Sequence, residues 1–272
     1  LSSITNDKPD QGYENSLISA DVSTTFEQFQ DVYATLGLSA SFDDLTTDDT
    51  ASQSLQKQSG EFAEISGIYG FVFDKRNRTF MPTEGSILSF NQSFPFYADK
   101  SFISNSFAYS TYKTINENVV GAGKFYLNAI NGLGDDDVRL SKRTRLSTKR
   151  LRGFQYGQIG PREGDEPLGG ENYAVSRIEA NFPLGLPKEL GFYGGLFAEA
   201  GSLWGLKYDN NKVVVDPNNI KSVDSKIRSS IGFTLYWSTP IGPLQFNWAK
   251  PQQYESGVDK TENFSFNIAS QF

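Results

Sequence analysis

The last ten residues of the chain, NFSFNIASQF (Asn263 to Phe272), alternate between large apolar side chains and small or polar ones. Phe264, Phe266, Ile268 and Phe272 fall on one face of an extended segment, because successive side chains of a strand point to opposite faces. This alternation predicts a β-strand that is apolar on one face only.

The same alternation continues upstream through most of the chain. GPLQFNWAKP (242–251) and KIRSSIGFTLYWSTP (226–240) place Leu, Ile, Phe and Trp on one face and mostly Gly, Ser, Thr, Asn and Gln on the other. Weaker versions of the pattern occupy eight earlier segments, approximately 13–29, 31–44, 61–74, 86–96, 101–115, 119–130, 172–182 and 191–204. Together these segments predict about eleven strands, several of ten residues or more.

The length and polarity of these strands indicate a membrane protein. Strands of soluble proteins usually have about five or six residues, whereas about ten residues cross a bilayer at a tilt. The second face carries Ser, Asn, Gln, Thr, Gly and Glu, which are too polar for a dry core. A closed sheet in lipid satisfies its backbone groups without leaving an edge in hydrocarbon. The sequence therefore predicts an all-β fold, an antiparallel transmembrane β barrel with an apolar, aromatic exterior.

The connections between the predicted strands alternate in length. Short turns fall at FEQFQD, TINEN, PLGLPKELG and STPIGPL, and longer links fall at 45–60, 131–171, 205–225 and 250–262. This layout is typical of outer-membrane barrels, which close with an even number of strands in bacteria. An odd count of about eleven leads us to expect that 1–272 is the C-terminal portion of a barrel domain, beginning in a loop or strand end.

The composition excludes several classes of function. The chain has 272 residues, 25 Lys and Arg against 32 Asp and Glu, and neither Cys nor His. The absence of Cys and His from the sequence excludes disulfides, thiolate chemistry, Ser-His catalysis and the usual zinc ligands. We therefore expect no enzymatic activity, no cofactor and no bound metal. Mildly acidic, scattered charge also argues against a nucleic-acid partner, which normally leaves a basic footprint.

The link 131–171 differs from the others because it contains the basic stretch TKRLRGFQYG (148–157). The next two predicted strands carry Glu179 and Glu199. A charge facing lipid at mid-depth is destabilising, so we expect both carboxylates to face the lumen. Arg152 is suited to bind them there, since its planar guanidinium can bind a carboxylate with two hydrogen bonds. The alternative is a solvated surface loop, the usual fate of a charge run.

RLRGF, FAEAGSLW and the C-terminal Phe together resemble the BamA family of outer-membrane protein assembly factors, over nearly the whole chain. The resemblance implies a sixteen-stranded barrel when complete, with further strands and periplasmic POTRA domains upstream of this chain. It also implies that the loop 131–171 folds into the lumen. The loop tip would be Leu151, Arg152, Gly153 and Phe154, and the acidic partners of the arginine would be Glu179 and Glu199. Leu151 stands where Val is usual and Glu199 where Asp is common, which leaves the charges unchanged.

The resemblance further implies that the protein inserts other barrel proteins into the outer membrane of a Gram-negative bacterium. Its expected partners are unfolded outer-membrane protein clients, accessory assembly lipoproteins and outer-membrane lipids. A client strand would add to a weakly paired seam between the first and last strands. Phe264, Phe266, Ile268 and Phe272 would belong to that seam, and they resemble the terminal signal by which barrel proteins are recognised for assembly. A plain lipid-facing strand explains the same residues.

Three other functions are compatible with the pattern: a two-partner secretion pore, a TamA-like assembly factor and a passive porin. The Arg-Gly-Phe loop has no purpose in a porin.

Two further motifs have plain interpretations. DKRNRTFMPTEG (Asp74 to Gly85) is read as a turn on the periplasmic rim, and the acidic run Asp135 to Asp137 lacks the spacing of a calcium loop, so it is read as solvated charge.

Overall fold

A computed structural model of the chain describes residues 2–8, 13–206, 219–239 and 242–268. Twelve strands pair in a single antiparallel sheet, almost entirely in sequence order. They are β1 (Ser2–Lys8), β2 (Tyr13–Phe29), β3 (Val32–Thr47), β4 (Gly60–Asp74), β5 (Gly85–Ala98), β6 (Phe102–Asn116), β7 (Val119–Gly132), β10 (Asn172–Pro183), β11 (Phe192–Trp204), β13 (Arg228–Thr239), β14 (Gly242–Gln253) and β15 (Phe264–Ile268). The connections hold α1 (Gln53–Gln56), the 3-10 helix η2 (Lys188–Leu190) and a small sheet of β8 (Arg162–Glu163), β9 (Glu166–Pro167) and β12 (Ile220–Lys221).

The prediction of an all-β antiparallel fold with eleven to twelve strands is confirmed. Each of the eleven predicted segments contains a strand, and β1 is the addition, in a region expected to be a loop or strand end. It pairs with β2 from Ser2 opposite Ser19 to Lys8 opposite Tyr13. Its sequence, SSITNDK, is mostly polar, and for this reason alternation alone did not identify it.

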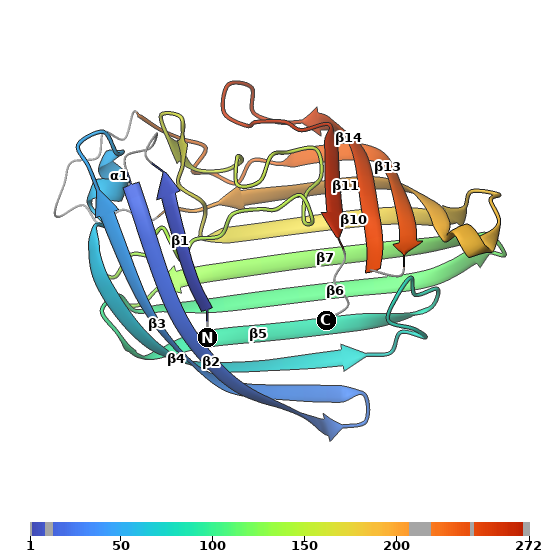
Figure 1. Cartoon of the computed structure of the whole chain (residues 1–272), viewed down its shortest axis with the longest axis horizontal. Coiled ribbons are helices and arrows are strands. Elements are labelled where there is room, and N and C mark those ends of the chain that lie inside the picture. Colours follow the sequence, from blue (N-terminus) through green and yellow to red (C-terminus); the bar gives the residue numbers. More distant parts are fainter. Residues whose placement is uncertain (1, 9–12, 207–218, 240–241, 269–272) are drawn as a thin grey trace.

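The sheet curls around its own concave face, and a long connection lies inside the curl (Figure 1). Within the described residues, β1 pairs only with β2 and β15 only with β14, so the sheet has two edges and is not closed. The total of sixteen strands in a complete barrel stays a prediction.

The two faces of the sheet differ as the alternation predicted. On the convex face, Ile178 is 68% exposed and Leu196 is 56% exposed. On the concave face, Glu179, Thr234 and Asn247 are buried. An apolar surface turned outward and polar groups turned inward suit a sheet surrounded by lipid. No helix among the described residues has the length and apolar character to cross a membrane.

The connections gather at two opposite ends of the sheet (Figure 1). We call the end with the short connections the turn end; it includes the turns at Gln30–Asp31 and Glu117–Asn118. The other end, the loop end, carries the connections 48–59, 133–171 and 254–263 and the described residues 205–206 and 219–227.

The loop end is covered by packed connections. Leu45 and Leu55 form a buried cluster with Leu140, Leu168 and Leu206, which belong to the later loops. Arg139 lies 3.4 Å from Asp43 in an ion pair. Burial lowers the pKa of Arg139 to about 10, although the Asp43 carboxylate opposes this shift. These contacts hold the long connection 133–171 under a cover of neighbouring loops.

Candidate functional site

The connection 133–171 returns from β7 to β10 across the concave face of the sheet. Its apolar residues Leu146, Leu151, Phe154 and Ile159 form a buried cluster with Val175 and Leu203 of the sheet. Burying such side chains stabilises a structure by about 1.5–3 kcal/mol each. The loop is therefore packed against the wall and is not a solvated surface segment.

The tip of this loop, Leu151 to Phe154, is a tight bend. The amides of Arg150 and Leu151 both donate to the Ser147 carbonyl oxygen, at 2.8 and 3.0 Å. Gly153 has φ of +90°, a conformation that glycine adopts without steric cost. A Cβ atom added there would lie 3.2 Å from the Ser230 side chain and 3.3 Å from that of Pro251. The tip is thus seated closely against β13 and β14.

The structure brings Arg152 together with both expected acids. Its side chain is 1% exposed, and Nη2 lies 2.7 Å from Glu179 Oε1 and 3.1 Å from Glu199 Oε2. Nε also donates to Glu199, and Nη1 donates to Thr234 Oγ1 at 2.9 Å. The Arg152 backbone amide donates to Glu199 as well. The guanidinium carbon lies 3.4 Å from the centre of the Phe197 ring, within the range of a cation–π contact.

Two further cations complete the site, and the alternation in the sequence did not point to either of them. Arg177 Nε lies 2.6 Å from Glu199 Oε2, and Arg177 Nη2 donates to the carbonyl oxygens of Lys149 and Arg150 at 3.0 Å each. Lys124 Nζ lies 2.6 Å from Glu179 Oε2. The register of the strands is the signal that identifies these two cations. Arg177 of β10 lies opposite Lys124 of β7 on one side and opposite Glu199 of β11 on the other.

The resulting ion cluster consists of Lys124, Arg152, Arg177, Glu179 and Glu199. Glu179 lies within ion-pair distance of Lys124, Arg152 and Arg177. Glu199 lies within ion-pair distance of Arg152 and Arg177. Removing one partner from this cluster breaks several buried hydrogen bonds to charged groups, each worth about 1.5–3 kcal/mol. The cluster therefore fastens the loop tip to β7, β10, β11 and β13.

The loop tip is also joined to the segment that leads into the last described strand. Phe154 forms an isolated β-bridge with Thr261. The Glu262 amide donates to the Gly153 carbonyl oxygen at 3.0 Å, and the Gln155 amide donates to Lys260 at 2.9 Å. The loop tip is thus hydrogen-bonded to residues 260–262, a segment that ends two positions before β15.

The terminal-strand residues lie on the convex face of β15. Phe264, Phe266 and Ile268 are exposed, and the first two pair in register with Trp248 and Phe246 of β14. Phe272 lies outside the described residues. The placement of these side chains fits a lipid-facing strand, and their expected role as a seam or assembly signal stays a prediction.

A curled antiparallel sheet with an apolar exterior, long loops at one end and an arginine-anchored loop inside defines the class: an outer-membrane β-barrel sheet with an occupied lumen. The chain belongs to the Omp85 superfamily, because the family model for the Omp85 superfamily domain matches residues 2–272.

Curated relatives agree with this family and with the expected resemblance to BamA. The chain is 28% identical over 278 residues to the outer membrane protein assembly factor BamA of Neorickettsia risticii, covering 98% of this chain and 35% of that protein. It is 26% identical to sorting and assembly machinery component 50 homolog A of Xenopus laevis, covering 82% of this chain and 49% of the relative. The chain thus spans less than half the length of these relatives.

Solved structures show the same fold. BamA from Haemophilus ducreyi lacking POTRA domains 1–3 superposes with a TM-score of 0.84 at 24% identity, over 97% of this chain and 56% of that chain. CdiB from Acinetobacter baumannii superposes with a TM-score of 0.55 at 10% identity, over 94% of this chain.

Proposed function

We propose that this chain is the C-terminal part of a barrel, integral to the outer membrane of a Gram-negative bacterium, that folds and inserts other β-barrel proteins. The observation that carries the proposal is an Omp85 sheet whose internal loop is locked by Arg152 and joined to the segment before β15. The assembly factors BamA and component 50 among its relatives support this role. The clients are unfolded outer-membrane proteins, and accessory lipoproteins are further proposed partners.

The mechanism needs no covalent step. β15 spans Phe264–Ile268 among the described residues, and its second edge has no strand partner there. Unpaired amide and carbonyl groups on such an edge can add an incoming strand, which gains main-chain hydrogen bonds as it inserts. We infer that a seam at this edge admits the client, while the ion cluster keeps β10, β11 and β13 fixed. On this view the protein acts as a template and not as an enzyme.

The experiment is an insertion assay with the whole protein in lipid vesicles and an unfolded barrel client. Because the chain contains no cysteine, a cysteine at Ser265 of β15 can be paired with one on the strand that faces it in the complete barrel. Oxidation should stop client insertion, and reduction should restore it. Each single-cysteine variant serves as the control, since it should insert clients under both conditions. Equal insertion by the oxidised and reduced double variant would refute the seam.

A further inference from the structure

The connection between β4 and β5, Lys75 to Glu84, is held in one shape by its own side chains. Arg76 binds the Asp74 carboxylate through two nitrogens, at 2.9 and 2.7 Å. Asn77 donates to Thr83 Oγ1 at 2.7 Å and accepts from the Thr83 amide at 3.1 Å. Thr114 of β6 donates to the Thr83 carbonyl oxygen at 3.2 Å.

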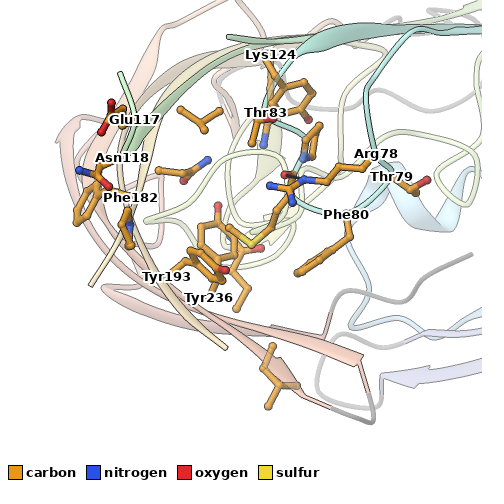
Figure 2. Close-up of a pocket in the computed structure, with 18 residues that line it drawn as sticks. Arg78, Thr79, Phe80, Thr83, Glu117, Asn118, Lys124, Phe182, Tyr193 and Tyr236 are labelled. Atoms are coloured by element: carbon orange, nitrogen blue, oxygen red, sulfur yellow. Dashed lines mark hydrogen bonds between the residues drawn. The ribbon is translucent and has the colours of Figure 1, made fainter. Parts of the chain in front are cut away.

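This turn forms one wall of a cavity of about 510 Å³ at the turn end. Arg78, Phe80 and Met81 line it from the turn, and the facing wall includes Tyr193 and Tyr236 of β11 and β13 (Figure 2). The volume falls within the range of about 300–1,000 Å³ that is usual for small-molecule sites. Mostly aromatic and aliphatic side chains with a few polar groups line such sites.

The charges in the cavity favour an anion. Arg78 extends toward the middle of the cavity, and its Nε donates to the Met81 carbonyl oxygen at 2.7 Å, which fixes its direction. Lys124 also lines the cavity but is already paired with Glu179. Among the described lining residues Glu117 is the one carboxylate, and it lies far from Arg78 in Figure 2. The described lining thus holds two cations, Arg78 and Lys124, against one carboxylate, and Arg78 is exposed.

We propose that this cavity is a binding site for an aromatic organic anion, a carboxylate or sulfonate attached to a flat apolar ring system. The anionic group binds Arg78, and the rings pack against Tyr193 and Tyr236. A guanidinium forms its strongest hydrogen bonds with charged oxygens, and aromatic rings bury large apolar areas against one another. Because Lys124 touches both the cavity and Glu179, an occupant also lies next to the anchor of the internal loop.

The test is calorimetric titration of naphthalene-2-carboxylate into the whole protein in lipid nanodiscs, with the heat of empty nanodiscs subtracted. Naphthalene-2-carboxamide is the neutral comparison ligand. We expect the carboxylate to bind at least tenfold more tightly than the carboxamide. Arg78→Gln should weaken carboxylate binding about tenfold and leave carboxamide binding unchanged, since a hydrogen bond to a charged group is lost. Lys75→Gln, an exposed cation of the same turn outside the cavity lining, is the matched control and should bind normally.

Val120→Phe provides a second variant, because Val120 lines the cavity and a larger side chain would fill it. It should weaken both ligands about equally. Equal affinity of wild-type protein for the two ligands, or an Arg78→Gln variant that binds the carboxylate as tightly as Lys75→Gln does, would overturn the proposal. No client protein is present in this titration, so its outcome is independent of the assembly role.

Discussion

Arg152 illustrates how a single side chain can hold a long loop. Four of its donor groups, the backbone amide and three side-chain nitrogens, are used by Glu179, Glu199 and Thr234. A lysine could not reproduce this, since its ammonium is a compact point charge without a planar fork. The buried guanidinium is tolerated because Glu179, Glu199 and Thr234 accept its hydrogen bonds.

Replacement of this arginine tests the anchor. Arg152→Ala should lower the free energy of unfolding in lipid vesicles by about 3–5 kcal/mol, because the loop tip loses its buried hydrogen bonds to Glu179 and Glu199, each worth about 1.5–3 kcal/mol. The measurement is a denaturant titration, together with growth of cells that depend on the variant. Arg150→Ala is the control, since Arg150 contacts the Tyr126 ring at 4.1 Å and neither acid in the cluster. Equal effects of the two variants would contradict the anchoring role.

The conformation of Gly153 makes a second prediction at this scale. Gly153→Ala should destabilise the protein by about 1–3 kcal/mol, because an L-residue is strained at φ of +90° and its Cβ would crowd Ser230 and Pro251. Gly185→Ala is the matched control: φ is +74° there, and a Cβ would meet nothing within 4 Å. The same denaturant titration compares them. A Gly185→Ala variant as unstable as Gly153→Ala would show that the backbone conformation, and not the close seat of the tip, sets the cost.

At the scale of the elements, each long strand has one face suited to lipid and one face suited to the polar interior. The convex face of β10 presents Ile178 outward, and the concave face carries Arg177 and Glu179. In a soluble sheet such an exposed isoleucine would be of little consequence, whereas in lipid it is the preferred residue. The alternation of apolar and polar residues in the sequence therefore reflects the contrast between lipid on the convex face and polar groups on the concave face.

Substitution on the convex face distinguishes these environments. Ile178→Arg should cost about 2–4 kcal/mol in lipid vesicles, since a guanidinium near mid-bilayer must leave water. Asn118→Arg, in the turn between β6 and β7, places the same charge at the end of the sheet and should change stability by less than about 1 kcal/mol. Both values come from denaturant unfolding in the same vesicles. A neutral Ile178→Arg variant would indicate that this face does not contact lipid.

The segment 254–263 before β15 is held by its own ion pairs. Arg228 lies 3.0 Å from Asp259 and 3.3 Å from Glu255, and Lys226 lies 2.5 Å from Glu255. Burial by itself would raise the pKa of the Glu255 carboxyl, but hydrogen bonds from Lys226 and Ser222 and the charge of Arg228 outweigh it and hold this pKa below its usual value of 4.5.

This depressed pKa predicts an acid-sensitive segment. A carboxyl whose pKa is lower in the folded state contributes stability above its unfolded pKa, and that contribution is lost as the pH falls through the folded pKa. The melting temperature should therefore fall more for wild-type protein than for Glu255→Gln when the pH drops from 6 to 3. The difference should correspond to about 1 kcal/mol or less, because the pair is partly exposed. Parallel pH curves for the two proteins would exclude Glu255 as a contributor.

For the whole molecule, the sheet and its internal loop act as one unit. The loop packs on β10 and β11, its tip reaches β13 and β14, and the covering loops close the loop end. A lumen filled in this way should conduct ions poorly, unlike the lumen of a diffusion porin.

Single-channel recording of the whole protein in planar bilayers measures this directly. We expect low and intermittent conductance from the wild-type protein. Replacement of residues 140–168 by a short Gly-Ser linker should give a larger and steadier conductance, because the packed loop is removed. A large, steady open pore in the unaltered protein would contradict an occupied lumen and favour the porin.

Much of this architecture could be predicted from the sequence, because a bilayer imposes a period of two on every crossing strand. The alternation in NFSFNIASQF and its upstream counterparts was sufficient for the all-β antiparallel sheet and for the inward orientation of Glu179. Strand β1 was not predicted, because alternation identifies a strand only where one face is apolar and the other polar, and β1 is mostly polar on both. Arg177 and Lys124 were not predicted either, because their place in the ion cluster depends on the register of three strands.

The sequence by itself determined which residues face lipid and which face the lumen. Successive side chains of a strand point to opposite faces, so the local alternation of apolar and polar residues is enough to assign them. Only the tertiary structure decided where the loop tip comes to rest, that it joins the segment before β15, and that the turn from Asp74 to Gly85 encloses a cavity with rings from β11 and β13. Those outcomes depend on how far the sheet curls, and curvature is a collective property of paired strands that no local pattern contains.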